Sequence, residues 1–127
     1  MKKSILVVDD SAAILDVVKI ALEMADYEVY TSLTGACFQH MEQHLPDLIL
    51  LDILLSGENG GEICQRLKSD EQTRHIPVIL LSAHAGLRET AERCGANDFL
   101  VKPFRLSALR EIVKKYLSLP SMTPFSS

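Results

Sequence analysis

The sequence has few cysteines, and they are far apart. Cys37, Cys64 and Cys94 are the three in 127 residues, and no CxxC pair occurs. An odd number of separated cysteines indicates neither a disulfide framework nor a zinc knuckle. We therefore interpret them as reduced, structural thiols.

Long apolar stretches are also missing. The longest purely apolar runs are a few residues, whereas a membrane-spanning helix needs about 20. Near the N-terminus, Lys2 and Lys3 precede the four apolar residues 5–8, which are followed at once by two aspartates. A secretory signal needs a longer apolar region and a small-residue cleavage site. The sequence predicts a cytoplasmic protein with no membrane partner.

Positive charge is not in excess. The chain has 13 Lys and Arg against 17 Asp and Glu, a formal net charge of −4. Nucleic acids are polyanions, so we expect no direct nucleic-acid binding through the overall charge of this chain. The hydrophobic content of 47% and charged content of 24% are typical of a globular protein, and the length suits one core.

Four short apolar runs predict strands that are buried on both faces of a parallel sheet. They are residues 5–8, 48–51, 78–81 and 99–101. Residues 28–31 alternate polar and apolar side chains, which suits an edge strand.

Segments with helical spacing lie between and after these strands. The first, residues 11–25, places six apolar residues on one expected face: Ile14, Val17, Val18, Ala21, Met24 and Ala25. The others carry the apolar sets Phe38, Met41 and Leu45; Ile63, Cys64 and Leu67; residues 87–94; and residues 105–117. Strand and helix alternate five times, which predicts an α/β doubly wound parallel sheet with five strands and five helices. We expect one domain over residues 1–118 and a Ser/Pro-rich tail or linker over 119–127.

Chemically active side chains follow the expected strands. Asp9 and Asp10 follow the first run, Asp52 the third strand, Ser82 the fourth and Lys102 the fifth. Carboxyl ends of parallel strands share one edge, where open α/β sheets bind ligands. The sequence therefore gathers three carboxylates, a hydroxyl and an ammonium group at that edge.

This set of groups favours phosphoryl chemistry. Clustered carboxylates repel one another unless a cation compensates, and oxygen ligands suit Mg²⁺. A divalent ion, an ammonium group and a hydroxyl donor can together hold a phosphoryl group. No GxxxxGK[ST] loop is present, so the carrier of the phosphate is expected to be an aspartate acting as nucleophile.

The motifs DD, LD, SA and KPF, in this order at the strand ends, resemble the receiver domain of two-component response regulators, which is chemotaxis-regulator-like and flavodoxin-like. The resemblance covers roughly residues 3–117. It implies a three-layer α/β/α fold with strand order 2-1-3-4-5. It also implies a cis peptide bond between Lys102 and Pro103.

The resemblance implies a role for each motif residue. Asp52 would accept a phosphoryl group from a sensor histidine kinase or a phosphotransfer protein. The Mg²⁺ ligands would be Asp9, Asp10, Asp52 and the backbone carbonyl of Leu54. Lys102 would pair with Asp52 and then with its phosphoryl group. Ser82 and Phe99 would switch the face made by helix four, strand five and helix five.

A downstream protein or a fused output domain would bind that face. The protein could also form a homodimer. The protein would be a signalling phosphoacceptor with limited self-catalysed phosphoryl transfer and dephosphorylation, not a metabolic enzyme.

Several positions depart from the family pattern. Position 82 is Ser where Thr is commoner, and position 99 is Phe where Tyr is frequent. Position 56 is Ser where a proline is usual. The segment from Ser82 to Lys102 is about two residues shorter than is common, which predicts a short or displaced fourth helix.

Three alternatives remain open on sequence alone. The chain could be a receiver-like interaction domain that works without phosphorylation. An aspartate-nucleophile phosphatase needs a DxD pair, and here Leu54 occupies the second position. A flavin-binding module needs a Ser/Thr/Gly loop after the first strand, which is missing. His40 and His44 have metal-binding spacing, but a solvated helix face is the better interpretation.

Overall fold

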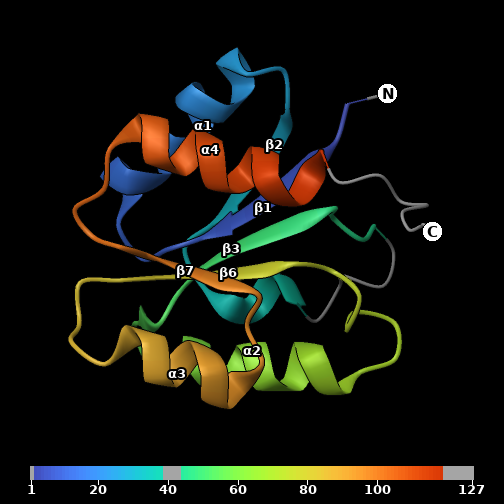
Figure 1. Cartoon of the computed structure of the whole chain (residues 1–127), viewed down its shortest axis with the longest axis vertical. Coiled ribbons are helices and arrows are strands. Elements are labelled where there is room, and N and C mark those ends of the chain that lie inside the picture. The colour runs from blue at the N-terminus through green and yellow to red at the C-terminus, as the bar shows by residue number, and fades with distance from the viewer. Residues whose placement is uncertain (1, 39–43, 119–127) are drawn as a thin grey trace.

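A five-stranded parallel sheet forms the centre of the protein. The computed structural model describes residues 2–38 and 44–118. Its sheet strands are β1 (Ser4–Val8), β2 (Glu28–Ser32), β3 (Leu48–Asp52), β6 (Val78–Ser82) and β7 (Asp98–Val101). They pair in parallel in the order β2-β1-β3-β6-β7 (Figure 1). This is the expected order 2-1-3-4-5 when the sheet strands alone are counted, so the sheet prediction is confirmed.

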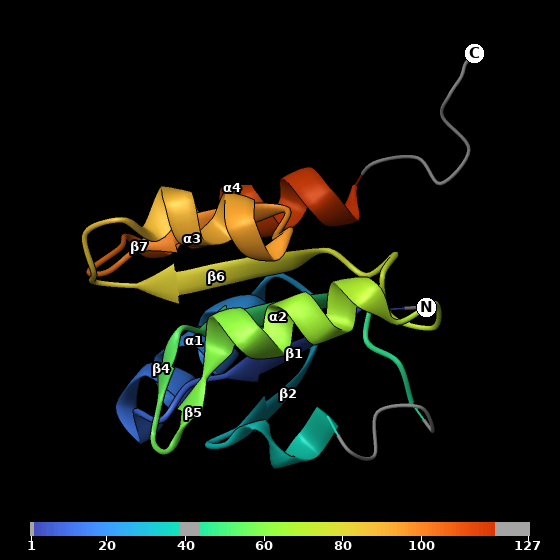
Figure 2. The same ribbon diagram turned by 90° about the horizontal axis from the view of Figure 1, so that it is seen from below.

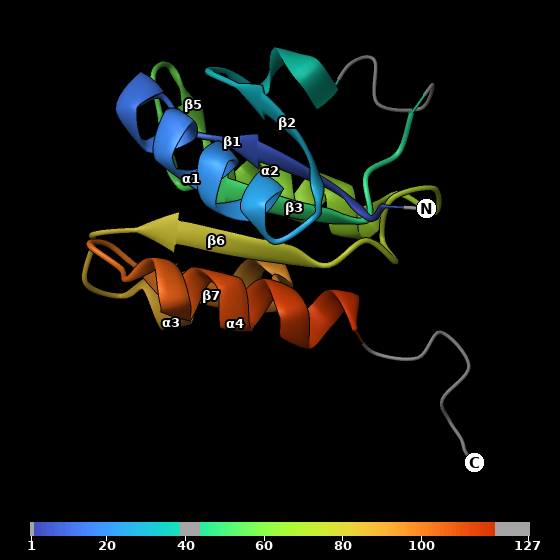
Figure 3. The ribbon, with the colours of Figure 1, turned by 90° about the horizontal axis from the view of Figure 1, so that it is seen from above.

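Two pairs of helices cover the two faces of the sheet. The helices α1 (Ala12–Met24) and α4 (Leu106–Leu117) lie side by side on one face (Figure 3). The helices α2 (Gly60–Ser69) and α3 (Leu87–Cys94) cover the opposite face (Figure 2). The predicted three-layer arrangement is therefore confirmed.

The core has two halves because successive residues of a strand point to opposite faces. On β1, Ile5 and Val7 pack under α1 and α4, whereas Leu6 and Val8 pack over α2 and α3. All five residues of β1, β3 and β6 are buried. This double burial explains why those strands have no polar alternation, while the edge strand β2 does.

The number of helices differs from the prediction. Five are expected from the sequence, and the described residues contain four α-helices. Residues 35–38 form one 3₁₀ turn. The rest of the segment expected around Phe38, Met41 and Leu45 includes residues 39–43, which lie outside the described residues, as do His40 and the tail 119–127.

The predicted apolar face of α1 is confirmed at Val18 and Ala21 but wrong at Val17, Met24 and Ala25. The buried residues are Leu15, Val18, Ala21 and Leu22. Val17 and Met24, which we expected inside, are 50% and 83% exposed. The helix is apolar on most of its circumference, so periodicity does not select one face; its contacts with the sheet and α4 do.

A small antiparallel hairpin that the sequence does not signal follows β3. It consists of β4 (Leu54–Leu55) and β5 (Glu58–Asn59), joined by a turn at Ser56 and Gly57. Gly57 has a φ of 73°, a left-handed conformation that glycine adopts without steric cost. The hairpin lies beside the arrowhead end of the sheet (Figure 2), at the carboxyl ends of the strands.

Other expectations can be compared directly with the structure. The helix α3 has eight residues and is the shortest of the four described α-helices, as the shortened segment predicts. Cys37, Cys64 and Cys94 are free thiols, and the last two are buried. Among the described residues, no helix is both long and apolar enough to cross a membrane.

Candidate functional site

The strand ends bring the three aspartates together. Asp9 follows β1, Asp10 comes next, and Asp52 is the last residue of β3. One carboxylate oxygen of each lies within 4.8 Å of those of the other two. These residues are adjacent because β1 and β3 are neighbouring parallel strands that end at the same level.

Asp9 is fully buried and is held on both of its oxygens. Its Oδ2 lies 2.7 Å from Lys102 Nζ, and its Oδ1 accepts a hydrogen bond of 2.9 Å from the Ser11 backbone N–H. Ser11 also begins α1, because its hydroxyl accepts the Ile14 N–H at 3.3 Å. The start of α1 therefore positions Asp9 as well.

Asp52 has a weaker set of partners. It is 5% exposed, its Oδ1 accepts the Leu54 N–H at 3.3 Å, and its Oδ2 lies 3.5 Å from Lys102 Nζ. Burial raises the pKa of Asp52 and repulsion from Asp9 raises it further, while Lys102 acts in the opposite direction. Lys102 is thus shared, and its closer partner is Asp9.

The hairpin points the main chain of Leu54 towards this site. Gly60 donates its N–H to the Ile53 carbonyl at 2.7 Å, directly beside the ladder that pairs Leu54 with Asn59. The adjacent pair, Leu54 and Asn59, is then a non-bonded pair, whose N–H and C=O groups face away from the partner strand. The Leu54 N–H does reach Asp52, donating to its Oδ1 at 3.3 Å.

Gly60 makes this close approach of the two strands possible. A methyl group at residue 60 would overlap the Asp52 carbonyl oxygen and lie 2.8 Å from the Ile53 Cα. Both obstacles are backbone atoms, which do not move aside easily. A side chain at residue 60 would therefore displace the chain that carries Asp52.

Ser82 and Lys102 complete the edge of the sheet. Ser82 ends β6, is 1% exposed, and accepts the His84 N–H on its hydroxyl oxygen at 2.9 Å. Lys102 donates its backbone N–H to the Ser82 carbonyl at 2.9 Å, so the two residues are adjacent. The Lys102–Pro103 bond is cis, as expected.

Phe99 lies in β7, further from the site. Its ring is partly buried against the α2/α3 half of the core. The Arg88 guanidinium carbon, from α3, lies 5.5 Å from the ring centroid. A cation at this distance is attracted by the ring face.

The acidic cluster fits a hard divalent cation. All its side-chain donors are carboxylate oxygens, and these are the ligands that Mg²⁺ prefers. The three carboxylates outnumber the single ammonium group of Lys102, so the site has an excess of negative charge. Asp10 is exposed, which leaves a solvent-facing side for the water ligands that Mg²⁺ keeps.

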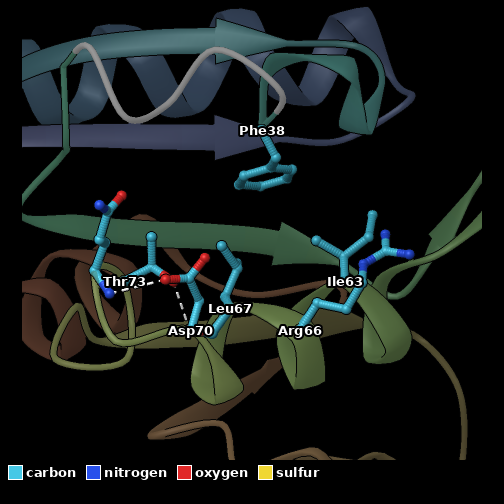
Figure 4. Close-up of a pocket in the computed structure, with 7 residues that line it drawn as sticks. Phe38, Ile63, Arg66, Leu67, Asp70 and Thr73 are labelled. Carbon is cyan, nitrogen blue, oxygen red and sulfur yellow. Dashed lines mark hydrogen bonds between the residues drawn. The ribbon is translucent and has the colours of Figure 1, made fainter.

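The pockets found among the described residues are not lined by Asp9, Asp10 or Asp52. A pocket of about 170 Å³ lies between Phe38 and α2 (Figure 4). Its Asp70 carboxylate already accepts the Gln72 N–H at 2.9 Å. A second, mainly apolar groove of about 490 Å³ runs between α1 and residues 102–106, and it includes Lys102.

Comparison with known proteins decides the family. The family model for the response regulator receiver domain matches residues 5–114. The chain belongs to this receiver family. Receiver domains are signalling phosphoacceptors that bind Mg²⁺ in an acidic site, and the acidic cluster lies at the strand ends where the motifs place it.

Relatives of this receiver domain differ in length. A "DNA-binding dual master transcriptional regulator RpaA" from Synechocystis is 39% identical over 94% of this chain, and the chain spans about half (51%) of it. The "polar-differentiation response regulator DivK" from Brucella ovis is 34% identical over 92% of this chain and 98% of its own length. The matched region thus occurs both within longer proteins and as nearly a whole protein.

Solved structures agree with the receiver fold. A putative response regulator from Chloroflexus aurantiacus has a TM-score of 0.87 at 30% identity, covering 94% of this chain and 100% of that one. The receiver domain of a sensor histidine kinase from Pseudomonas aeruginosa has a TM-score of 0.84 at 28% identity, and the match covers 94% of this chain and 100% of that one. That structure contains a magnesium ion coordinated in its active-site cleft.

Two contacts at the receiver site are not predicted by the sequence. The Ser56 hydroxyl donates to Asp10 Oδ2 at 3.3 Å across 46 residues of chain. Position 56 stood out in the sequence as a departure from the usual proline, but the hairpin that carries it has no signal in the sequence. The closer pairing of Lys102 with Asp9 was likewise not foreseen.

Proposed function

We propose that this chain is a phosphorylation-dependent receiver in which Asp52 accepts a phosphoryl group from a phosphohistidine of a sensor histidine kinase or a phosphotransfer protein. The observation that carries the proposal is the convergence of Asp9, Asp10 and Asp52 within 4.8 Å, with Lys102 contacting two of them. Of the two buried members of this cluster, Asp52 has the longer ion pair with Lys102, 3.5 Å against 2.7 Å for Asp9, so its carboxylate is less committed than that of Asp9.

Each residue has a defined part in the transfer. A carboxylate oxygen of Asp52 attacks phosphorus, an O–P bond forms, and the P–N bond to the donor imidazole breaks as the nitrogen leaves with its electron pair. Lys102 moves its ammonium group towards the incoming phosphoryl oxygens. Asp9, Asp10, Asp52 and the Leu54 carbonyl would hold Mg²⁺, which supplies positive charge opposite those oxygens. Slow attack by water on the phosphoaspartate gives the limited self-dephosphorylation.

The groove beside the site suits the approach of the donor. Ile14 and Val17 of α1 line one side, and Pro103 and Phe104 line the other. Val17 is 50% exposed and, on the next turn of α1, Ile20 is 60% exposed. An apolar surface next to Lys102 lets a helix of the donor protein dock while its phosphohistidine faces Asp52.

The switch uses Ser82 and Phe99. The Ser82 hydroxyl now accepts from His84, so donating to a phosphoryl oxygen would draw residues 82–84 towards Asp52. This movement frees space for Phe99 to rotate inward, away from Arg88, and changes the face made by α3, β7 and α4. A downstream protein, a fused output domain or a second copy reads that face.

A phosphodonor experiment tests the proposal. We expect acetyl phosphate and Mg²⁺ to add one acid-stable, base-labile phosphoryl group to the wild type, seen by intact-protein mass spectrometry. Asp52→Asn should abolish it. The matched control, Asp26→Asn, changes an exposed aspartate in a left-handed conformation that asparagine also tolerates, and it should be modified like the wild type.

A wild type that stays unmodified with acetyl phosphate and with a phosphorylated histidine phosphotransfer protein would overturn the proposal. The chain would then act as a receiver-like interaction domain that does not need phosphorylation. Steady turnover of small phosphate esters would instead indicate a phosphatase, which the side chain of Leu54 makes less suitable because it supplies no second carboxylate.

A further inference from the structure

Asp10 is held differently from the other two aspartates. Asp9 and Asp52 are buried and both face Lys102, whereas Asp10 is exposed. Among the described residues, the side chain that reaches Asp10 is Ser56, whose hydroxyl donates to Oδ2 at 3.3 Å. An exposed carboxylate without such a partner samples several rotamers.

The hairpin presents Ser56 from a fixed position. On the β4 side, Leu55 is buried, and the Ile53 carbonyl accepts the Gly60 N–H. On the β5 side, Glu58 Oε1 accepts the Gly35 N–H at 2.8 Å, which ties the hairpin to the segment after β2. The turn at Ser56 is thus anchored through both strands of the hairpin.

Asn59 adds a third anchor at the end of the hairpin. Its side-chain oxygen accepts the Glu62 N–H at 3.2 Å and caps the start of α2. The hairpin is therefore continuous with a helix that packs on the core. The Ser56 hydroxyl consequently belongs to a rigid element, although it lies at the surface.

We propose that Ser56 is a positioning residue for the magnesium site, because its hydrogen bond holds the Asp10 carboxylate in the orientation that binds the ion. This inference rests on the proposed function, since it assumes that the three aspartates bind Mg²⁺. The hydroxyl donates to Asp10 Oδ2, so Oδ1 remains for the ion.

The hydrogen bond from Ser56 should strengthen Mg²⁺ binding, because the ion needs the Asp10 side chain in one orientation. Holding the side chain before the ion arrives reduces the rotamer freedom that is lost on binding, so the hydroxyl strengthens binding. Groups that orient a metal ligand typically contribute about 10–100-fold to metal affinity. Because this bond is exposed, we expect the low end, about tenfold.

Titration of ¹⁵N amide shifts with MgCl₂ tests the inference without any phosphodonor. Ser56→Ala should raise the dissociation constant for Mg²⁺ about tenfold, and Ser56→Thr, which keeps the hydroxyl, should restore most of the affinity. Ser69→Ala is the matched control: it removes another exposed hydroxyl, one that bonds the Gln65 carbonyl within α2, and should bind like the wild type. Asp10→Asn should abolish saturable binding.

The outcomes separate the two proposals. If the wild type shows no saturable Mg²⁺ shifts, the proposed function fails. If the wild type binds but Ser56→Ala binds equally well or more tightly, the positioning role of Ser56 fails while the receiver function stands. If Ser56→Thr binds as weakly as Ser56→Ala, the hydroxyl is not the group that acts, and the inference is again overturned.

Discussion

At the scale of single residues, the site is built on an imbalance of charge. Lys102 lies 2.7 Å from Asp9 but 3.5 Å from Asp52, and both aspartates are buried. A buried carboxylate needs a close cation or several hydrogen-bond donors, and Asp52 has neither in full. Without a bound metal, Asp52 therefore opposes the stability of the fold that presents it.

This opposition predicts a pH-dependent effect of Asp52→Asn. Burial and repulsion from Asp9 raise the folded-state pKa of Asp52 above 3.8, its ordinary value. The charged form consequently destabilises the folded protein at pH values above that raised pKa, and this cost vanishes below 3.8. In EDTA, we expect Asp52→Asn to have a higher free energy of unfolding than the wild type at pH 7, with a difference that shrinks as the pH is lowered.

Urea unfolding between pH 4.5 and 7.5 measures this difference. Asp16→Asn, on the exposed side of α1, is the control, and its stability should run parallel to that of the wild type. A constant gap between Asp52→Asn and the wild type at all pH values would contradict the prediction.

At the scale of elements, the β4–β5 hairpin connects three parts of the site. It carries Ser56 to Asp10, it turns the Leu54 main chain towards Asp52, and it leads directly into α2. All three depend on how closely the end of the hairpin approaches the end of β3. Gly60 sets that distance because it has no side chain.

Gly60→Ala should therefore be strongly destabilising. Its methyl group would overlap the Asp52 carbonyl oxygen, and overpacking against backbone costs about 2 kcal/mol or more. The control is Gly57→Ala, which has nothing within 4 Å of the added Cβ but keeps a φ of 73°, so it should cost about 1–2 kcal/mol from backbone strain. Urea unfolding measures both variants. Equal free energies of unfolding would contradict the prediction, because they would mean that the hairpin and the end of β3 move apart at no cost in stability.

At the scale of the whole molecule, Lys102 links the end of the first strand, β1, to the end of the last strand, β7. Its ammonium group, after the last strand, pairs with Asp9, after the first strand, across 93 residues. Asp9 is fully buried, so removal of this cation leaves an uncompensated charge inside the fold. A bound divalent cation is the other group able to offset that charge.

Lys102→Met should lower the free energy of unfolding in EDTA by about 3 kcal/mol, the usual range for breaking one side of a buried ion pair. Saturating Mg²⁺ should recover part of the loss, because the ion neutralises the same carboxylates. Lys115→Met removes the exposed pairing with Asp98 at 3.6 Å and should cost less than about 1 kcal/mol, with no recovery in Mg²⁺. Thermal unfolding with and without Mg²⁺ measures both, and a loss in Lys102→Met that Mg²⁺ leaves unchanged would count against a shared cation site.

The sheet and the set of groups at its edge can be predicted from the amino-acid sequence. Strands buried on both faces must be apolar throughout, so residues 5–8, 48–51 and 78–81 can be identified without tertiary information. The same prediction for residues 99–101 is wrong in its burial, because β7 is an edge strand that is only partly buried and Val101 is 51% exposed. The groups that follow them must then meet, because parallel strands end at one edge. That is why Asp9, Asp10, Asp52 and Lys102 were named correctly as neighbours from their positions in the chain.

How those neighbours divide their contacts depends on the packing of distant elements. The buried face of α1 does not follow from periodicity because nearly all of that helix is apolar, and contact with the sheet selects the face. Lys102 lies closest to Asp9, and Ser56 bonds Asp10, because the strand ends and the six-residue hairpin bring these atoms within a few ångströms. Local periodicity carries information about one element at a time, whereas these pairings depend on the relative placement of elements that are 46 to 93 residues apart.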